Sequence, residues 1–274
     1  MLKSLGGGNR YEVVLVWDDF LFSIAVAKVL RPDQAGDEKA LRDLRREWEV
    51  LGHLAHPMIV RGFDAVLDGE LPHLLIEHLE GPSLRRLLRR GGPLSQQQLL
   101  PLALHVAGAL QYLANEEVVH LDVKPDNIVM GIPPRLIDLS IARPLERAAK
   151  TRGPVGTDAY MAPEQCAPGH GTIGSAADVW GLGATLHHAV SGSVPFPREK
   201  GTKQSEDPVV RFPQLVEDPQ PLPGSAPPEL RELVAAALRR DPAERPSAAE
   251  IAGALEPLVA ELPRRLKLGR RGPA

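Results

Sequence analysis

The sequence has a single cysteine, Cys166, and no apolar run close to the roughly 20 residues that a membrane-spanning helix needs. One thiol excludes an intramolecular disulfide framework and is typical of a reducing compartment. The first residues contain no apolar stretch of signal-peptide length. A net charge of −3 gives no broad basic surface for nucleic acid. We therefore expect a cytoplasmic globular protein that neither spans a membrane nor binds nucleic acid.

The first part of the 274-residue chain has the pattern of a small sheet with one helix. Residues 11–17 and 24–30 are rich in β-branched and aromatic types, which predicts two paired strands. Apolar residues at helical spacing predict an amphipathic helix over 40–54. Further apolar stretches at 59–67 and 71–79 complete the predicted sheet.

The remainder of the chain has the pattern of helices. Capping-box patterns begin at Ser95, ahead of an apolar-periodic run over 99–113, and again at Ser175 and Ser247. Gly192 lies where the middle helix should end. The stretch from 193 to 228 contains nine prolines and no helical period. We expect that stretch to be a functional surface loop or partly disordered.

Three groups of polar residues follow one another in the middle of the chain: HLDVKPDN at 120–127, DLS at 138–140 and APE at 162–164. Phosphoryl transfer from a nucleotide requires that a polyanion be held, neutralised by metal and approached in line by a hydroxyl. A base, a cation and two oxygen ligands for Mg²⁺ meet these needs. The candidates, in that order, are Asp122, Lys124, Asn127 and Asp138.

The N-terminal candidates for phosphate binding carry less weight when taken singly. The glycines Gly6, Gly7 and Gly8 could let bare backbone approach phosphates, although a plain turn explains such a triplet equally well. Lys28 ends an apolar strand and could bridge phosphates, whereas an edge-strand lysine would extend to solvent. Glu47 could pair with Lys28 or lie solvated on its helix. The downstream motifs, in their fixed order, favour the functional interpretation of the set.

From about residue 5 to 255 the chain resembles bacterial eukaryotic-type serine/threonine protein kinases, on the motifs just given. The resemblance implies an α+β, bilobal fold: an antiparallel-sheet N-lobe with one main helix at 1–79, and a larger, mainly helical C-lobe at 80–262. A basic tail would occupy 263–274. It also implies ATP and Mg²⁺, or Mn²⁺, in the cleft, and protein substrates with a serine or threonine acceptor.

The resemblance assigns further roles. It implies a Lys28–Glu47 ion pair, Asp122 as catalytic base and Thr157 as the residue that steadies Asp122 and Lys124. It implies metal ligation by Asn127 and Asp138 and a nucleotide site formed by Gly6, Gly7, Gly8, Val13, Val26, Lys28, Ile76, Glu77, Leu79 and Val129. Structural roles are implied for a Glu164–Arg245 pair and for Asp178 beneath the catalytic loop.

The sequence departs from the family pattern at several positions. Leu121 replaces the arginine that commonly binds a phosphorylated activation loop, so we expect activity not to depend on phosphorylation of Thr151. Leu139 and Ser140 replace Phe-Gly after the metal-binding aspartate, and Tyr11 stands at the third glycine of the loop.

Two other functions share this fold. A nucleotide-binding pseudokinase scaffold would fit the departures, and a small-molecule phosphotransferase would lack a peptide platform of the kind predicted at 156–164. Whether two copies associate through the N-lobe is left open. A zinc site at His53 and His56 is disfavoured, because no Cys or second His pair completes it.

Overall fold

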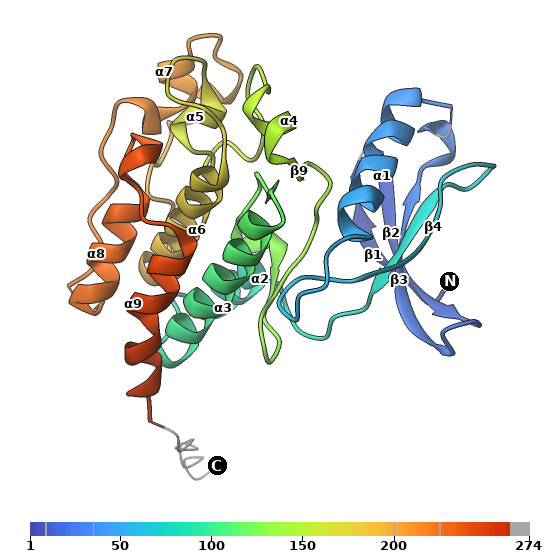
Figure 1. The fold of residues 1–274 in the computed structure, drawn as a ribbon, viewed down its shortest axis with the longest axis horizontal. Coiled ribbons are helices and arrows are strands. Elements are labelled where there is room, and N and C mark those ends of the chain that lie inside the picture. The colour runs from blue at the N-terminus through green and yellow to red at the C-terminus, as the bar shows by residue number, and fades with distance from the viewer. Residues whose placement is uncertain (9, 35, 200, 225, 264–274) are drawn as a thin grey trace.

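The computed structural model describes residues 1–8, 10–34, 36–199, 201–224 and 226–263, and these form two lobes (Figure 1). The small lobe contains an antiparallel sheet in the order β1-β2-β3-β5-β4. Its strands are β1 (Lys3–Gly7), β2 (Tyr11–Asp18), β3 (Ser23–Leu30), β4 (Gly62–Val66) and β5 (His73–Glu77). The architecture confirms the predicted α+β fold with a sheet-rich small lobe.

The strand β1 was not predicted from the sequence. All five of its residues are exposed, and it pairs with β2 through the backbone, Lys3 opposite Leu15. Glycine has low β propensity and supplies no side chain to pack, so neither composition nor alternation indicated this strand. The observed sheet therefore begins before Tyr11. Gly6 and Gly7 are the last residues of β1, and Gly8 follows them in the turn to β2.

Helix α1 (Glu38–Leu51) lies beside the sheet and begins at an aspartate cap. The Asp37 carboxylate accepts hydrogen bonds from the backbone N–H groups of Lys39 and Ala40, at 2.8 and 3.4 Å. These bonds satisfy first-turn donors that have no partner within the helix. The helix ends at Leu51, three residues before the predicted end at 54.

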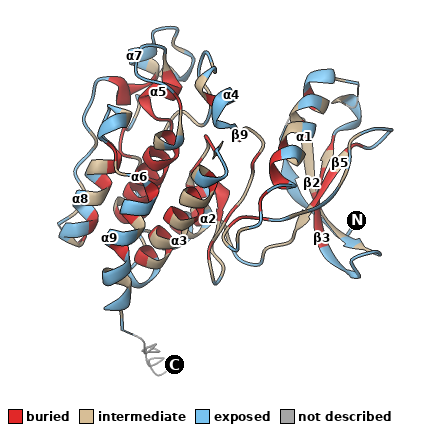
Figure 2. Ribbon diagram, viewed as in Figure 1, coloured by how far each residue is buried: buried red, intermediate tan, exposed pale blue. Residues whose placement is uncertain are grey.

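The large lobe is mainly helical, with short strands near the cleft. The helices α3 (Gln96–Asn115) and α6 (Ser175–Ser191) form its buried centre and stand out in red in Figure 2. The other elements are α2 (Leu84–Gly91), β6 (Val118–Val119), β7 (Ile128–Val129), β8 (Arg135–Leu136), β9 (Arg143–Pro144), α4 (Leu145–Ala149), α5 (Pro163–Cys166), α7 (Pro208–Arg211), α8 (Pro228–Ala237) and α9 (Ala248–Ala260).

Three of the predicted helix boundaries are confirmed and one predicted cap is wrong. Ser95 is the N-cap of α3, where its N–H donates to the Gln98 side chain at 3.3 Å. Ser247 caps α9, where its N–H donates to Glu250 and its hydroxyl accepts from the Glu250 N–H. Gly192 ends α6 in the left-handed conformation, at φ 79°. The N-cap of α6, however, is Gly174 rather than Ser175. The Asp178 carboxylate, which the local pattern assigned to a capping box, instead accepts hydrogen bonds from the backbone of His120 and Leu121, and this confirms the contact that the family resemblance implied.

The proline-rich stretch 193–228 is more ordered than expected. It contains α7 and the short 3-10 helices Thr202–Gln204 and Pro213–Leu215. Phe212 and Leu215 are buried against Met161 and Cys166. Pro208 and Pro213 begin two of these short helices, at positions where an N–H group would have no partner, so they set those two boundaries. The segment is thus part of the packed lobe.

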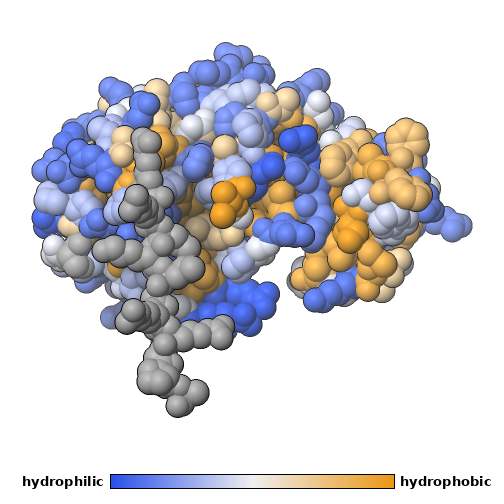
Figure 3. All heavy atoms as spheres, turned by 90° about the horizontal axis from the view of Figure 1, so that it is seen from below, coloured by the Kyte–Doolittle hydropathy of each residue, from blue (hydrophilic) through white to orange (hydrophobic). Residues whose placement is uncertain are grey.

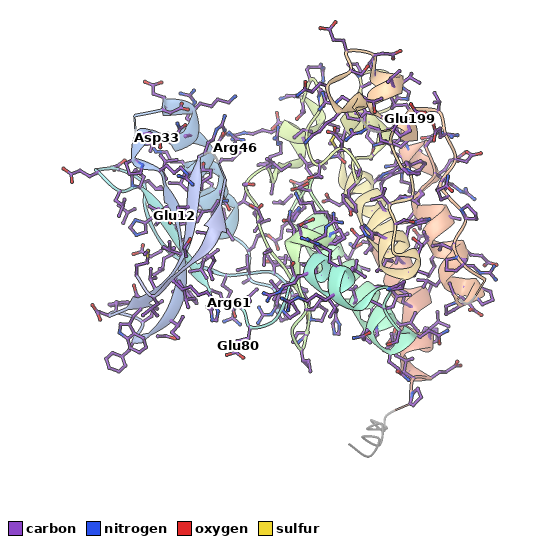
Figure 4. All side chains as sticks on the ribbon, turned by 180° about the vertical axis from the view of Figure 1, so that it is seen from behind. Glu12, Asp33, Arg46, Arg61, Glu80 and Glu199 are labelled. Carbon is purple, nitrogen blue, oxygen red and sulfur yellow. The ribbon has the colours of Figure 1, made fainter. Side chains whose placement is uncertain are left out.

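A short connection between β5 and α2 joins the lobes, and Figure 4 labels Glu80, which lies within it. The boundary at residues 79 and 80 stays a prediction. The predicted basic tail, from residue 264 onward, lies outside the described residues. Within the part of the chain that is described, no helix combines the length and apolar character of a membrane span.

Candidate active site

A cleft of about 780 Å³ lies between the sheet and the large lobe, and Figure 3 shows a notch between the lobes. Twelve of the predicted site residues line it. These are Gly7, Gly8, Val13, Val26, Lys28, Glu47, Ile76, Glu77, Leu79, Asn127, Val129 and Asp138. Gly6 is exposed beside the cleft, and Asp122, Lys124 and Thr157 lie outside its lining. Sequence reasoning did not assign Leu51, Val60 or Ile137 to this cleft, because apolar core residues carry no distinguishing signal.

Lys28 on β3 binds both carboxylate oxygens of Glu47 on α1, at 2.9 and 2.8 Å. Its ammonium also lies 3.3 Å from Oδ1 of Asp138. Burial alone would lower the pKa of Lys28, but the two carboxylates raise it above its ordinary value. Lys28 is therefore a fixed cation at the inner end of the cleft.

Asp138 follows β8 and faces Lys28. Burial would raise the pKa of its carboxyl, but the Lys28 ammonium and a hydrogen bond from Ser140 lower it to about 2. Its backbone is left-handed, at φ 63°, an uncommon conformation for a residue with a side chain. The neighbouring Leu139 is buried, so the apolar residue after the aspartate holds this strained turn in the core.

The loop between β6 and β7 is fixed from beneath by α6. Oδ2 and Oδ1 of Asp178 accept the backbone N–H groups of His120 and Leu121, each at 2.7 Å. Leu121 is left-handed, at φ 68°, and its carbonyl accepts a hydrogen bond from Gln165 at 2.9 Å. These bonds offset the strain at a bulky residue in this conformation.

Two glycines permit close backbone approaches at this loop. A Cβ on Gly156, whose φ is +122°, would lie 2.8 Å from the Leu121 carbonyl oxygen. A Cβ on Gly181 in α6 would lie 2.9 Å from the Val123 Cβ. The loop therefore rests directly on α6 and on the segment that contains Thr157.

The loop presents one carboxylate held by three partners. Asp122 accepts from Lys124 Nζ at 2.6 Å, from Thr157 Oγ1 at 2.7 Å and from Asn127 Nδ2 at 3.0 Å. Lys124 Nζ also donates to Thr157 Oγ1 at 2.7 Å. The structure thus brings together four of the predicted residues, and one orientation of the Asp122 carboxylate satisfies all these contacts.

The other end of the cleft is apolar. Val13 lies opposite Lys28 in the sheet, and Val26 lies opposite Ile76. The N–H of Glu77 donates to the Arg61 carbonyl at 2.9 Å, so this donor is already used within the protein. The Glu77 carboxylate binds Arg135 at 3.2 and 3.4 Å, a contact that the sequence did not indicate.

The oxygen donors near Lys28 fit a magnesium–nucleotide complex better than a closed metal cage. Asn127 donates its amide hydrogen atoms to Asp122, so its amide oxygen is the atom for a cation, and Asp138 is an ionised carboxylate beside the same cleft. Mg²⁺ is commonly held by one or two protein oxygens with phosphates and water. Among the described residues no group of three or more His, Cys, Asp or Glu forms a metal cluster, and His53 and His56 form none.

The segment after Asp138 contains contacts that sequence reasoning missed. Arg85 donates to the Tyr160 hydroxyl at 2.8 Å, and that hydroxyl lies 2.7 Å from Nδ1 of His188. The Asp158 carboxylate binds Arg198 and Arg211 at 2.8 and 3.2 Å. These pairs join residues far apart in the sequence, and a single sequence gives no signal for them. They attach the segment around Thr157 to the large lobe.

The predicted structural pair also forms. Arg245 binds Glu164 through Nη1 and Nη2, at 2.6 and 2.8 Å. The Cys166 side chain lies nearby and is buried, and burial raises the pKa of its thiol above its ordinary value.

The family model described as "Protein kinase domain" matches residues 1–254. The serine/threonine-protein kinase PkaA of Streptomyces coelicolor is 36% identical over 241 residues, which cover 85% of this chain and 42% of PkaA. PknB of Mycolicibacterium smegmatis is 32% identical over 257 residues, 89% of this chain and 40% of PknB. PrkC of Bacillus subtilis is 31% identical over 204 residues, 73% of this chain and 31% of PrkC.

The chain thus spans less than half the length of these curated relatives. The match extends over both lobes and includes the strand that carries Lys28 and the loop that carries Asp122. With the fold and the cleft as described, this chain belongs to the protein kinase domain family.

Proposed function

We propose that this chain transfers the terminal phosphoryl group of ATP to serine or threonine hydroxyls of proteins, in a magnesium-dependent reaction. The observation that carries the proposal is the Asp122 carboxylate, held by Lys124, Thr157 and Asn127 next to a cleft that contains the Lys28–Glu47 pair. Groups that would serve as base, as phosphate-binding cations and as oxygen ligands for Mg²⁺ therefore lie around one cleft.

Asp122 would orient the acceptor hydroxyl and take its proton as the bond to phosphorus forms. Lys124 would face the charge of the transferred group, and its contact with Thr157 would keep both side chains in place. Lys28, held by Glu47, would bind the phosphates of the nucleotide that remain as leaving group. The apolar end of the cleft, with Val13, Val26, Ile76 and Val129, would take the base.

Asn127 and Asp138 would hold Mg²⁺. When bound, the ion neutralises charge on the phosphate oxygens. The low pKa of Asp138 supports this role, because the carboxylate stays ionised at any pH at which the enzyme would work.

We propose specificity for serine or threonine from Lys124 and from the names of the relatives, each of which is a serine/threonine-protein kinase. The ordered segment at 156–164 supports a peptide acceptor rather than a small molecule, because arginine contacts at Asp158 and Tyr160 hold it beside Asp122.

We propose that activity does not require phosphorylated Thr151. Leu121 has no cationic group, and the Lys28–Glu47 pair is formed while Thr151 carries only its hydroxyl. That hydroxyl accepts from Arg143 at 3.1 Å and donates to the Arg147 carbonyl at 3.2 Å, so the unmodified segment already has partners.

A cytoplasmic location and a homodimer through the N-lobe stay predictions. The exposed apolar residues Trp17, Phe20 and Phe22, at the end of β2 and in the turn that leads to β3, support an association there. Light scattering measures the mass of the wild type and of a Phe20→Ser variant in solution. The dimer prediction requires the mass of two chains for the wild type and of one chain for the variant.

The test of the proposed function is ATP-dependent phosphate incorporation with Mg²⁺ into a generic basic protein. Asp122→Asn should lose at least about a hundredfold in rate while it still binds Mg-ATP. Lys28→Met should lose nucleotide binding as well. Asp68→Asn, on the surface and paired only with Arg45 in the described structure, is the matched control and should keep wild-type activity.

Phosphoserine or phosphothreonine in the product, absent with Asp122→Asn, would support the kinase. Mg-ATP binding that depends on Asp138 without any transfer would support a nucleotide-binding scaffold. Phosphate transfer to a small molecule but to no protein would support a small-molecule phosphotransferase.

A further inference from the structure

Tyr11 is the first residue of β2 and contacts three different parts of the small lobe. It lies two residues before Val13, so both side chains are on the cleft face of the sheet, the face that also carries Lys28 opposite Val13. Its backbone carbonyl accepts the N–H of Gly8 at 2.9 Å, which closes the glycine turn between β1 and β2.

The Tyr11 side chain reaches helix α1. Its hydroxyl donates to the Ala40 carbonyl at 3.1 Å, and Ala40 is fully buried in the first turn of the helix. The neighbouring Arg10 binds Asp43, one turn further along, at 3.0 Å. The start of β2 is thus attached to α1 at two successive turns.

The Tyr11 ring also covers the lysine of the cleft. Lys28 Nζ lies 5.0 Å from the ring centroid, within the range of a cation–π contact. The same ammonium is bound by Glu47 on α1. Burial raises the pKa of Tyr11 to about 12, so the hydroxyl keeps the proton that it donates. One residue therefore contacts the glycine turn through its backbone, α1 through its hydroxyl and Lys28 through its ring.

We propose that Tyr11 is a positioning residue that makes the glycine turn and α1 move as one unit. The inference rests on the proposed function in one respect: nucleotide phosphates would contact the glycine turn and Lys28. If the turn and α1 are joined, a nucleotide that orders the turn also stabilises the position of α1 that forms the Lys28–Glu47 pair. By linkage, a change that loosens α1 must weaken the binding of the nucleotide by the same factor.

The experiment compares the wild type with Tyr11→Phe, which keeps the ring, and Tyr11→Leu, which loses it. Hydrogen exchange of the α1 amides is measured without nucleotide and with Mg²⁺ and a non-hydrolysable ATP analogue. Tyr112→Phe is the matched control, because it also loses a phenolic hydroxyl, one that binds the Ala55 N–H.

Without nucleotide, Tyr11→Phe should speed exchange in the first turns of α1 by roughly two- to tenfold, as expected for one lost hydrogen bond. Tyr11→Leu should increase the exchange rate in these turns by a larger factor than Tyr11→Phe does. With the analogue, the dissociation constant should rise by a similar factor, and nucleotide-dependent protection of α1 should shrink. Tyr112→Phe should leave both quantities at wild-type values. The midpoint of urea unfolding shows whether each variant is folded.

Wild-type exchange in α1 of both Tyr11 variants would overturn the proposal, as would faster exchange with an unchanged dissociation constant, because Tyr11 would then only stabilise α1 locally. A wild type that binds no nucleotide contradicts the proposed function instead. The nucleotide-free measurement still decides whether Tyr11 holds α1, since it depends on neither binding nor transfer.

Discussion

The guanidinium of Arg245 and the carboxylate of Glu164 form a two-bond pair whose side chains have no solvent-accessible surface. Removal of one partner leaves a buried, uncompensated charge. Glu164→Ala should therefore lower the free energy of unfolding by about 3–5 kcal/mol, measured by urea denaturation.

An exposed pair provides the control for that variant. Asp218 binds Arg240 at 2.9 Å in a largely solvated position. Asp218→Ala should change the free energy of unfolding by less than about 1 kcal/mol. Equal losses of unfolding free energy in the two variants would mean that the buried Glu164–Arg245 pair stabilises the fold no more than an exposed pair does.

Thr157 should affect turnover and not nucleotide affinity. Its hydroxyl donates to Asp122 and accepts from Lys124, so Thr157→Val removes both bonds with little change in volume. We expect kcat to fall about 10- to 100-fold, with rescue by Thr157→Ser. Steady-state kinetics and nucleotide titration measure this, and the exposed Thr172→Val is the control. A loss of nucleotide affinity equal to the loss in kcat would contradict the assignment.

One of the two buried histidines on α6, His188, should make stability depend on pH. Burial, with Arg85 and His187 nearby, lowers the pKa of His188 from 6.5 to about 4, so the folded chain excludes a proton that the unfolded chain binds. Its stabilising contribution is complete above pH 6.5 and is lost as the pH falls toward 4.

Between pH 7 and pH 5 the free energy of unfolding should fall by about 1 kcal/mol more in the wild type than in His188→Gln. This figure allows for partial solvent screening of the histidine. Urea denaturation at the two pH values measures the difference. His170→Gln, at an exposed site, should keep the wild-type dependence. A His188→Gln variant with the full wild-type loss would place the titration elsewhere.

Thr151→Ala should retain at least about a third of wild-type activity, because the hydroxyl contributes only two ordinary hydrogen bonds and Leu121 offers no cation for a phosphate. Initial rates of protein phosphorylation measure it. Activity as low as that of Asp122→Asn would show that a phosphate at Thr151 is required.

The glycine beneath the loop that carries Asp122, Gly181, should tolerate no side chain. Gly181→Ala places a Cβ 2.9 Å from Val123 and should cost about 1–3 kcal/mol of unfolding free energy, together with activity. Gly108→Ala in α3 meets no atom within 4 Å and should raise stability by up to about 1 kcal/mol. Thermal unfolding compares the two variants. An unchanged stability of Gly181→Ala would mean that α6 can move away from Val123 without cost.

The sequence predicts those parts of the fold that depend on local pattern. The strand pair that carries Val13 and Lys28 was predicted from residue types, as was the α9 cap at Ser247. The expected contacts of Lys28 with Glu47 and of Asp122 with Lys124 also form. A local sequence pattern predicts structure where the contacts of a residue are with residues close to it in the chain.

The parts that the sequence missed depend on partners distant along the chain. The Ser175 cap prediction failed because Asp178, which a local pattern assigns to the helix start, bonds to His120 and Leu121 more than fifty residues away, a contact that the family resemblance implied and the local pattern did not. The strand β1 pairs through backbone alone, and Phe212 packs in a proline-rich stretch against α5. Only the folded chain brings these partners together.

The burial of Cys166 has a practical consequence for optical measurements. Because the chain has no second cysteine and this thiol is shielded from solvent, the folded protein gives a low background with thiol-directed dyes. A cysteine introduced on the exposed side of α1 would therefore carry a single fluorophore in an otherwise wild-type chain. The movement of that helix could then be followed in real time as a nucleotide is added.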